Sequence, residues 1–495
     1  MQESLSHNIL RNSFYNFLTT GIGRIGALFF TGILARLLLP EGFGIYTLAV
    51  SFVFLFVTIL DVGVNSAVLK FVTIDEKEKS AAYFKYIFKI KFLLSLGIGF
   101  LLLLGAYPLS LLFNKSQLIT PIILSSVYII ALASESFFSS LFYIYNEVRT
   151  VMWKEALSQL LRIASLLLIP LLFIREHYIS ATILSLILTL FIILFFLILT
   201  LKRRHAPLFQ KTNIPIEKKA VKKFMIYVAL GVVSAMFLSY IDVFMLGFFI
   251  TDPSYVGYYR AATTLVFSIA GILTFSNVLL PKFVQVKKEN LQNSFDKVMK
   301  YSLALSIPAT FGLLVLGRYI IRSVYGYAYL DARYPLFFLS FIVIEAVISG
   351  VLYSLVSARG NPSIYTKASL FSLIISLFLT PLFIKLLLPI SLIAATTGAA
   401  LATLISRACY VMMLLKKTKK ILFLHLKFPY LLKPMIASSG MVFILLFIHL
   451  FTRDMTILQG ILEIILGVTV YFLLLLLLGG ITKDDIKLLN PKNFW

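Results

Sequence analysis

The sequence predicts an all-α polytopic membrane protein with about 14 transmembrane helices, arranged as two six-helix lobes followed by two additional helices. Three observations predict this class: fourteen long apolar stretches, a one-sided distribution of Lys and Arg, and an internal repeat. The composition agrees, because 60% of the 495 residues are hydrophobic and only 13% are charged, whereas a soluble domain carries about 25% charge. We therefore expect no sizeable soluble domain outside the membrane.

The apolar stretches have the length of membrane spans. A spanning helix needs about 20 apolar residues, because each residue adds about 1.5 Å and the hydrocarbon layer is about 30 Å thick. Fourteen stretches meet this requirement, at residues 14–38, 43–69, 92–113, 119–145, 152–174, 178–201, 224–250, 256–281, 298–317, 334–357, 364–387, 390–415, 429–451 and 458–481. Two joints are tight, at Arg175–His177 and Leu388–Pro389, and a merged pair at either would lower the count.

The basic residues give an independent test of this topology. With the N-terminus inside, the inner segments hold 33 of the 45 Lys and Arg, the outer segments hold 8, and four Arg lie within the stretches. Because inner loops of membrane proteins are enriched in Lys and Arg, this pattern predicts a multi-pass protein of the cytoplasmic membrane with both termini in the cytoplasm. Basic loops beside anionic lipids explain the net charge of +24, so no nucleic-acid partner is expected.

An internal repeat predicts how the stretches are grouped. Residues 40–46 (PEGFGIY) and 253–259 (PSYVGYY) share Pro, Gly and Tyr at the same spacing, 213 residues apart. A second echo links 149–170 to 359–381. Because both halves hold six stretches, the repeat is parallel, as in two-bundle transporters. The predicted domains are an N-terminal lobe at 1–201, a basic cytoplasmic linker at 202–223, a C-terminal lobe at 224–415, and two additional helices with a cytoplasmic tail at 416–495.

Signatures of soluble catalysis are missing from the sequence. It contains no phosphate-binding G-x-x-x-x-G-K-[ST] loop and a single Cys409, so we expect no direct use of ATP, no metal and no cofactor. A glycan polymerase or glycosyltransferase needs an acid–base group on a sizeable loop, but the outer segment 318–333 has Asp331 as its only carboxylate. The G-x-G-x-x-G pattern at 21–26 lies in an apolar stretch, which favours close helix packing. We expect a transporter and not an enzyme.

Charged residues inside the stretches are the candidate functional groups. A charge at the bilayer centre costs about 2.5–3.5 kcal/mol, so these side chains must face protein, each other or water. The set is Arg24, Arg162, Arg260, Arg407, Asp61, Glu135, Asp242 and Glu345.

The roles of these charges follow from their positions. Arg24 and Arg260, on the first and eighth stretches, are predicted to line a cavity and bind phosphate, since guanidinium matches phosphate geometry. Glu135 and Arg162 lie on neighbouring stretches and are predicted to form a structural ion pair. The three remaining carboxylates could bind a coupling proton or sodium ion, or neutralise an arginine. They are Asp61, Asp242 and Glu345.

Several segments resemble one family of membrane transporters. Residues 24–46 (RIGALFFTGILARLLLPEGFGIY), 61–63 (DVG), 241–247 (IDVFMLG) and 256–262 (VGYYRAA) resemble lipid-linked oligosaccharide flippases, the Wzx-type polysaccharide exporters of the MATE-like MOP superfamily. The resemblance implies a two-lobed transporter that moves a polyprenyl-(pyro)phosphate-linked oligosaccharide across the cytoplasmic membrane by alternating access. It also implies a pathway with glycosyltransferases and a polymerase for polysaccharide or cell-surface glycan biosynthesis.

The resemblance also bears on the site residues. Related lipid II flippases carry cavity arginines on their first and eighth helices, and Arg24 and Arg260 match those positions. A further arginine on the second helix of those flippases has no clear counterpart here. The alternative is a MATE-type cation-coupled multidrug exporter, which needs an acidic and aromatic cavity and is kept open by the three intramembrane carboxylates.

Overall fold

The computed structural model describes residues 2–73, 77–210, 212, 214–274, 283–284, 286–360, 363–449 and 457–481, and all regular secondary structure in these residues is helical. Twelve of its helices are long and apolar enough to cross a membrane, and a bent pair, Tyr327–Leu339 with Ile342–Ala358, gives a thirteenth crossing. The chain is therefore a multi-pass membrane protein. The predicted C-terminal tail, and the ends of the eighth and thirteenth stretches, lie outside the described residues.

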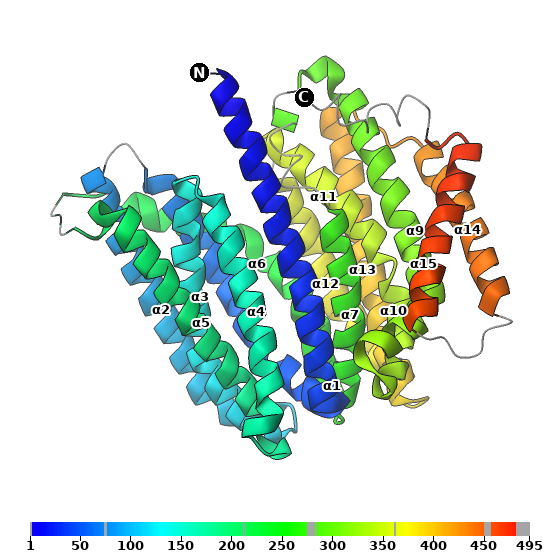
Figure 1. The fold of residues 1–495 in the computed structure, drawn as a ribbon, viewed down its shortest axis with the longest axis horizontal. Coiled ribbons are helices and arrows are strands. Elements are labelled where there is room, and N and C mark those ends of the chain that lie inside the picture. The colour runs from blue at the N-terminus through cyan, green and yellow to red at the C-terminus, as the bar shows by residue number, and fades with distance from the viewer. Residues whose placement is uncertain are drawn as a thin grey trace. The chain divides into compact units, whose positions relative to one another are not determined.

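The elements follow one another along the chain as Figure 1 shows. They are α1 (Gln2–Phe71), α2 (Lys77–Leu112), η1 (Ser116–Leu118), α3 (Ile119–Ile144), α4 (Val148–Leu172), η2 (Arg175–His177), α5 (Tyr178–Arg204), η3 (Ala206–Phe209), α6 (Lys218–Phe249), α7 (Ser254–Leu273), η4 (Lys288–Asn290), α9 (Leu291–Tyr325), η5 (Tyr327–Ala332), α10 (Arg333–Leu339), α11 (Ile342–Ala358), α12 (Ser363–Leu387), α13 (Leu392–Leu422), α14 (Pro429–His449) and α15 (Ile457–Leu477).

The longest element, α1, contains the first two predicted spans. It breaks at Leu39, whose φ of 57° and ψ of 172° are not helical, directly before Pro40. Proline lacks an N–H group and disfavours a helical conformation in the residue before it, so the chain cannot continue as one straight helix. Both tight joints are also real breaks, since η2 separates α4 from α5 and the helices α12 and α13 end and begin at Leu387 and Leu392. Each of the fourteen predicted stretches therefore has a helical counterpart.

Two asparagines close the helices that lead into short turns. Asn114 and Asn146 have positive φ values of 51° and 56°, a conformation that asparagine tolerates better than most residues. After Asn146, the Glu147 N–H donates to the Phe142 carbonyl at 2.8 Å, while the Asn146 N–H donates to the Tyr143 carbonyl at 3.2 Å. This pair of bonds satisfies the last carbonyls of α3 as a Schellman motif does, and α4 can begin only two residues later.

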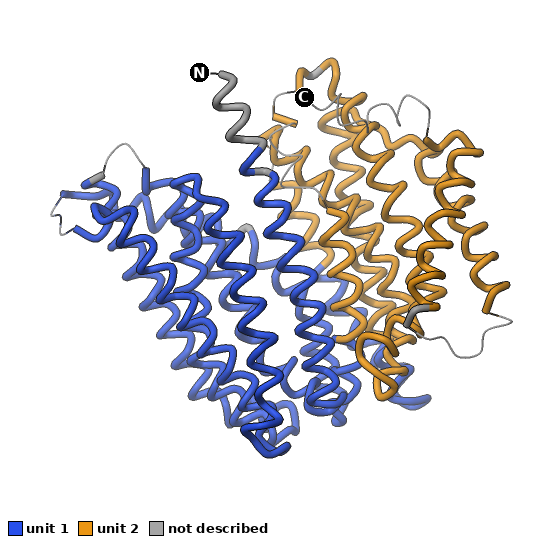
Figure 2. Tube along the Cα trace, viewed as in Figure 1, with its two compact units in different colours: residues 1–260, 373–396 blue, residues 261–372, 397–495 orange. Residues whose placement is uncertain are grey.

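The chain divides into two compact units, shown in different colours in Figure 2. Unit 1 contains residues 1–260 and 373–396, and unit 2 contains residues 261–372 and 397–495. The predicted lobe boundary at the 202–223 linker differs from this division. The difference arises because α6 packs against α1 and so joins the first unit. The division into transport lobes stays a prediction.

Unit 1 has an interior core and a lipid-like exterior. Its core includes Phe137, Phe142 and Leu197, none of which is exposed. On α5 the outward positions are equally apolar, with Leu188 56% and Phe195 65% exposed. A continuous apolar exterior of this kind is unfavourable in water but suits a hydrocarbon environment.

Unit 2 holds the last two predicted spans. The helices α14 and α15 pack on each other and on α9, around a cluster that includes Ala304, Met441 and Leu475. The buried Tyr471 hydroxyl donates a hydrogen bond to the Ala304 carbonyl at 2.7 Å. These contacts attach the two additional helices to the ninth span.

The two copies of the first repeat motif contact each other inside unit 1. A Cβ atom on Gly44 would lie 1.9 Å from the Pro253 carbonyl oxygen, and a Cβ on Gly257 would lie 2.3 Å from the Pro40 carbonyl oxygen. The glycine of each motif thus faces the proline of the other. The repeat predicted from the sequence therefore corresponds to a reciprocal packing contact at which only glycine allows the backbones to approach so closely.

Candidate functional site

A small pocket with several polar side chains in its lining lies in the helical interior of unit 1. Its volume is about 130 Å³, and its polar walls include Arg162 of α4, Arg260 of α7, Tyr46 of α1, Tyr128 of α3 and Gln159 of α4. The remaining lining residues are apolar or carry hydroxyl groups: Ala27, Phe30, Thr31, Phe43, Thr47, Val50, Ser51, Phe54 and Leu186. The lining thus carries two guanidinium groups and no carboxylate.

The polar atoms around this pocket have unused hydrogen-bonding capacity. Within the described residues, the buried Nε of Arg162, Oε1 of Gln159 and Oγ1 of Thr47 have no hydrogen-bond partner. The nearest carboxylate on α4, Glu155, already accepts a bond from the Gln159 side chain at 2.8 Å. Because an unpaired buried polar group is costly, a ligand oxygen that accepts from Arg162 Nε, or a water that also donates to Gln159 Oε1, would stabilise this arrangement.

The structure places Arg24 away from these walls. Arg24 is exposed on α1 and is not a lining residue of the pocket. The glycines on either side of Arg24 in the sequence instead face α4. A Cβ on Gly26 would lie 2.6 Å from Gln159, and one on Gly23 would lie 3.2 Å from Glu155, so the absence of a side chain lets α1 pack closely on α4. The predicted packing role of the G-x-G-x-x-G pattern is confirmed at these two glycines. Arg260 therefore shares the pocket with Arg162, and the sequence did not indicate that partner.

The structure pairs Glu135, predicted to bind Arg162, with a different cation of the helix that carries Arg162. The Glu135 carboxylate binds Lys154 at 2.9 Å and accepts a bond from the Ser139 hydroxyl at 2.9 Å. Lys154 lies on α4 two turns before Arg162 and is almost fully buried. Hydropathy placed Lys154 at the inner end of its stretch, where a lysine is expected to reach the membrane surface. Its pairing with Glu135 frees Arg162 for the pocket.

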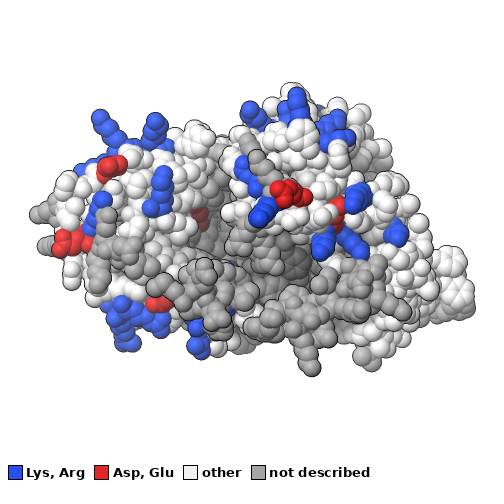
Figure 3. Space-filling model, turned by 90° about the horizontal axis from the view of Figure 1, so that it is seen from above, with Lys and Arg blue, Asp and Glu red and all other residues white. Residues whose placement is uncertain are grey.

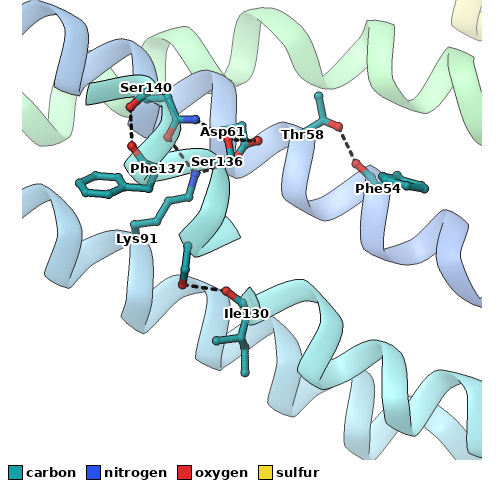
Figure 4. A network of polar contacts seen from close by, with 10 residues as sticks. Phe54, Thr58, Asp61, Lys91, Ile130, Ser136, Phe137 and Ser140 are labelled. Atoms are coloured by element: carbon teal, nitrogen blue, oxygen red, sulfur yellow. Dashed lines mark hydrogen bonds and ion pairs between the residues drawn. The ribbon is translucent and has the colours of Figure 1, made fainter. Parts of the chain in front are cut away.

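Asp61 belongs to a partly buried polar network, drawn in Figure 4. Its carboxylate forms an ion pair with Lys91 of α2 and accepts a hydrogen bond from Ser136 of α3 at 2.6 Å. Asn65 completes the network, because its side chain donates to Ser136 at 2.8 Å and accepts from Lys91 at 2.9 Å. Lys91 is only 1% exposed. It was assigned to an inner segment from the sequence, although it lies inside the helix bundle of unit 1.

The other two carboxylates also have partners. The Asp242 carboxylate accepts a hydrogen bond from the Tyr259 hydroxyl and a second from the Val243 N–H at 2.9 Å, so it connects α6 to α7. In unit 2, Glu345 of α11 pairs with Arg407 of α13 at 3.2 Å. The proposed coupling role of these carboxylates stays a prediction, and any such role requires release of these partners.

Two of the buried carboxylates occupy matching positions in the repeat. Glu135 and Glu345 are 210 residues apart, the same offset that separates Arg149 from Arg359. Each carboxylate is buried in its own unit and paired with a cation from another helix. The two halves therefore share a buried, ion-paired carboxylate in addition to the loop motif.

The sequence comparison identifies the family. A model of the family described as polysaccharide biosynthesis protein matches residues 9–287, which is more than half of the chain. The chain belongs to this family. Its helices make it a multi-pass membrane member of that family. A curated relative, described as a probable low-salt glycan biosynthesis flippase of Haloferax volcanii, is 28% identical over 191 residues, which cover 37% of this chain and 38% of that protein.

Solved structures show the fold of this family member. The lipid II flippase MurJ in an inward closed conformation matches with a TM-score of 0.72 and 18% identity, covering 94% of this chain and 98% of that one. An inward-facing multidrug resistance MATE transporter of the MOP superfamily matches with a TM-score of 0.61 and 14% identity, covering 83% and 95%. At these identities the likeness establishes the fold alone. The predicted MATE-like, all-helical class is confirmed.

Proposed function

We propose that this family member translocates a polyprenyl-(pyro)phosphate-linked oligosaccharide across the cytoplasmic membrane by alternating access. The observation that carries the proposal is the pocket with Arg162 and Arg260, whose lining contains two guanidinium groups and no carboxylate. Guanidinium groups bind phosphate oxygens through short, charge-assisted hydrogen bonds. A cavity for a cationic drug needs the opposite charge, so the pocket favours an anionic substrate over the multidrug alternative.

The chemistry of the substrate explains why a protein is needed. Sugars and phosphates cannot cross hydrocarbon bare, because each unpaired polar group costs several kcal/mol. In the proposed mechanism the phosphate binds Arg162 and Arg260 while the polyprenyl tail stays in the bilayer. Arg24, exposed on α1 one turn before the pocket-lining Ala27, is proposed to contact the headgroup as it approaches.

The remaining parts of the proposal concern direction and partners. Under the positive-inside rule, the basic inner segments favour a topology with both termini in the cytoplasm. A proton or sodium ion could return the empty carrier, since the membrane potential supplies about 2.3 kcal/mol per charge per 100 mV. Glycosyltransferases would supply the substrate on the inner side, and a polymerase would use it on the outer side.

The test is headgroup translocation in proteoliposomes that contain a polyprenyl-pyrophosphate-linked oligosaccharide. We expect Arg162→Gln and Arg260→Gln each to reduce transport at least about tenfold, the effect of losing one charge-assisted hydrogen bond. Arg24→Gln tests the approach step in parallel. Arg175→Gln is the matched control, because Arg175 is exposed in η2 and lies outside the pocket. Transport that survives both pocket substitutions would refute the phosphate-binding role. A gain of drug resistance in cells, without glycan transport, would favour the multidrug alternative.

A further inference from the structure

A second, larger pocket lies in unit 1 at the end of α1 that bears the N-terminus. Its volume is about 510 Å³, and it shares no residue with the pocket of Arg162 and Arg260. Four parts of unit 1 contribute to it: α1, the α3–α4 turn, the start of α4 and the end of α5. The lining residues are Arg11, Asn12, Tyr15, Asn146, Glu147, Arg149, Thr150, Trp153 and Arg204.

The α3–α4 turn builds the floor of this pocket. The left-handed Asn146 ends α3 and allows the 25-residue helix α4 to begin at Val148. The start of a helix carries a partial positive charge, and its first N–H groups point away from the helix body toward any anion placed there. Arg149, Thr150 and Trp153 occupy the first two turns of α4, so the pocket lies at this positive end.

One acidic residue lines the pocket, and it is already bound. Glu147 pairs with Arg204 at 2.6 Å and with the His205 ring at 2.9 Å. Burial raises the pKa of Glu147, but the hydrogen bonds from His205 and Arg204 outweigh it, so the pKa lies below its usual value. The carboxylate is therefore ionised at neutral pH and fixes the end of α5 against α4.

The charge that remains in the pocket is positive. Of the three arginines in the lining, Arg204 pairs with Glu147 and Arg11 has an interaction of its own. Arg149 has neither an ion-pair nor a hydrogen-bond partner for its side chain in the part of the chain that the structure describes. Figure 3 shows the face on this side of the molecule, on which many described Lys and Arg side chains are exposed. A multivalent anion would satisfy more of this charge than chloride could, because it can bind several guanidinium groups at once.

The aromatic residues of the pocket indicate which kind of molecule would carry the anion. Tyr15 and Trp153 line the same pocket, and Trp153 is 57% exposed. Tyrosine and tryptophan are typical of the headgroup level of a membrane, where an apolar ring and a polar edge are both satisfied. Guanidinium groups beside exposed aromatics at this level fit a phosphate that is attached to a lipid.

We propose that this pocket binds the phosphate of a lipid headgroup at the membrane surface. The lipid is either an anionic phospholipid that stabilises the α1–α4–α5 corner or the polyprenyl phosphate of the transport substrate before it moves inward. Only the second source rests on the function proposed above. Arg149 is the residue on which the binding depends most, since its guanidinium group is not used by the fold.

Trp153 provides a direct readout of binding. The chain has two tryptophans, so Trp495→Phe leaves Trp153 as the sole reporter in the purified, detergent-solubilised protein. We expect saturable changes in its emission on titration with short-chain phosphatidylglycerol or farnesyl phosphate. Inorganic phosphate serves as the probe without a lipid tail and should bind more weakly.

Matched arginine variants decide the result. Arg149→Gln should weaken binding at least about tenfold, as expected for a lost charge-assisted contact, and Arg149→Lys should recover part of it. Arg203→Gln is the control, because Arg203 is exposed beside Arg204 but lies outside the pocket. Melting temperatures of all variants should agree, which separates lost binding from lost folding.

The two sources give different patterns. Binding of farnesyl phosphate with reduced transport in Arg149→Gln assigns the pocket to the substrate. Preference for phosphatidylglycerol with normal transport assigns it to a phospholipid, and leaves the proposed function intact. The proposal is overturned if no probe saturates the signal, or if Arg149→Gln binds as tightly as Arg203→Gln.

Discussion

The reciprocal contact between the repeat motifs makes a sharp prediction about Gly44. In Gly44→Ala, the new Cβ would lie 1.9 Å from the Pro253 carbonyl oxygen, whereas non-bonded heavy atoms prefer about 3.5–4.0 Å. The backbones must therefore separate by roughly 1.5 Å, the shortfall from that preferred distance. Proline carbonyls are backbone atoms and cannot rotate away as a side chain does. Forcing extra volume into a packed interior costs about 1–3 kcal/mol, which exceeds the gain of about 1 kcal/mol from replacing a helical glycine with alanine.

The assay is thermal unfolding of the detergent-purified protein at a fixed scan rate. We expect Gly44→Ala to lower the melting temperature by about 2 °C or more, and Gly257→Ala to do the same because its Cβ would lie 2.3 Å from the Pro40 carbonyl oxygen. Gly97→Ala is the matched control, since no atom lies within 4 Å of its new Cβ. If Gly44→Ala melts together with Gly97→Ala, the close approach of the two motifs is not present in the protein.

Three further predictions concern charged groups elsewhere in unit 1. Lys91→Met should destabilise the protein by about 1–3 kcal/mol, because it removes the ion-pair partner of the partly exposed Asp61 carboxylate, and adding Asp61→Asn should restore most of the melting temperature. Lys115 donates to the carbonyls of Gly247 and Ile250 at 2.8 Å each, so Lys115→Met should lower the melting temperature by removing the cap of α6, and Lys115→Arg should lose less. The pKa of Glu147 lies below its usual 4.5, so its contribution to stability is complete above about pH 4.5 and is lost as the pH falls through the folded pKa. A pH series of melting curves should show this acid loss in the parent protein and not in Glu147→Gln.

The sequence predicts where the helices lie along the chain much better than it predicts which helices pack against each other. Length and hydropathy indicate all fourteen stretches, because each stretch alone must satisfy the thickness of the bilayer. The repeat motif was also readable, since Pro40 and Pro253 mark equivalent turns. Which side of a helix faces which neighbour depends on packing between helices, and hydropathy carries little information about it. Arg162 was therefore assigned to Glu135, although the structure pairs that carboxylate with Lys154.

Lysines near the ends of stretches show a second limit. Lys91 directly precedes an apolar stretch, and a lysine there usually extends its long side chain to the membrane surface. The structure instead buries it against Asp61. A signal was present in the sequence, since a carboxylate within a span needs a cation and Asp61 had no obvious partner. Because Asp61 needs a cation, a lysine at the end of a neighbouring stretch, such as Lys91, is a candidate partner.

The ion pairs of the intramembrane carboxylates bear on the role of Arg162. Among the residues that the structure describes, Asp61, Glu135 and Glu345 each form an ion pair with a cation other than Arg162. A guanidinium group without an ion pair is costly in the helical interior unless water or an anion reaches it. A single carboxylate in the pocket lining would compensate this charge. The lining carries none, which is the arrangement expected if the anionic substrate proposed above supplies the compensating charge only while it is bound.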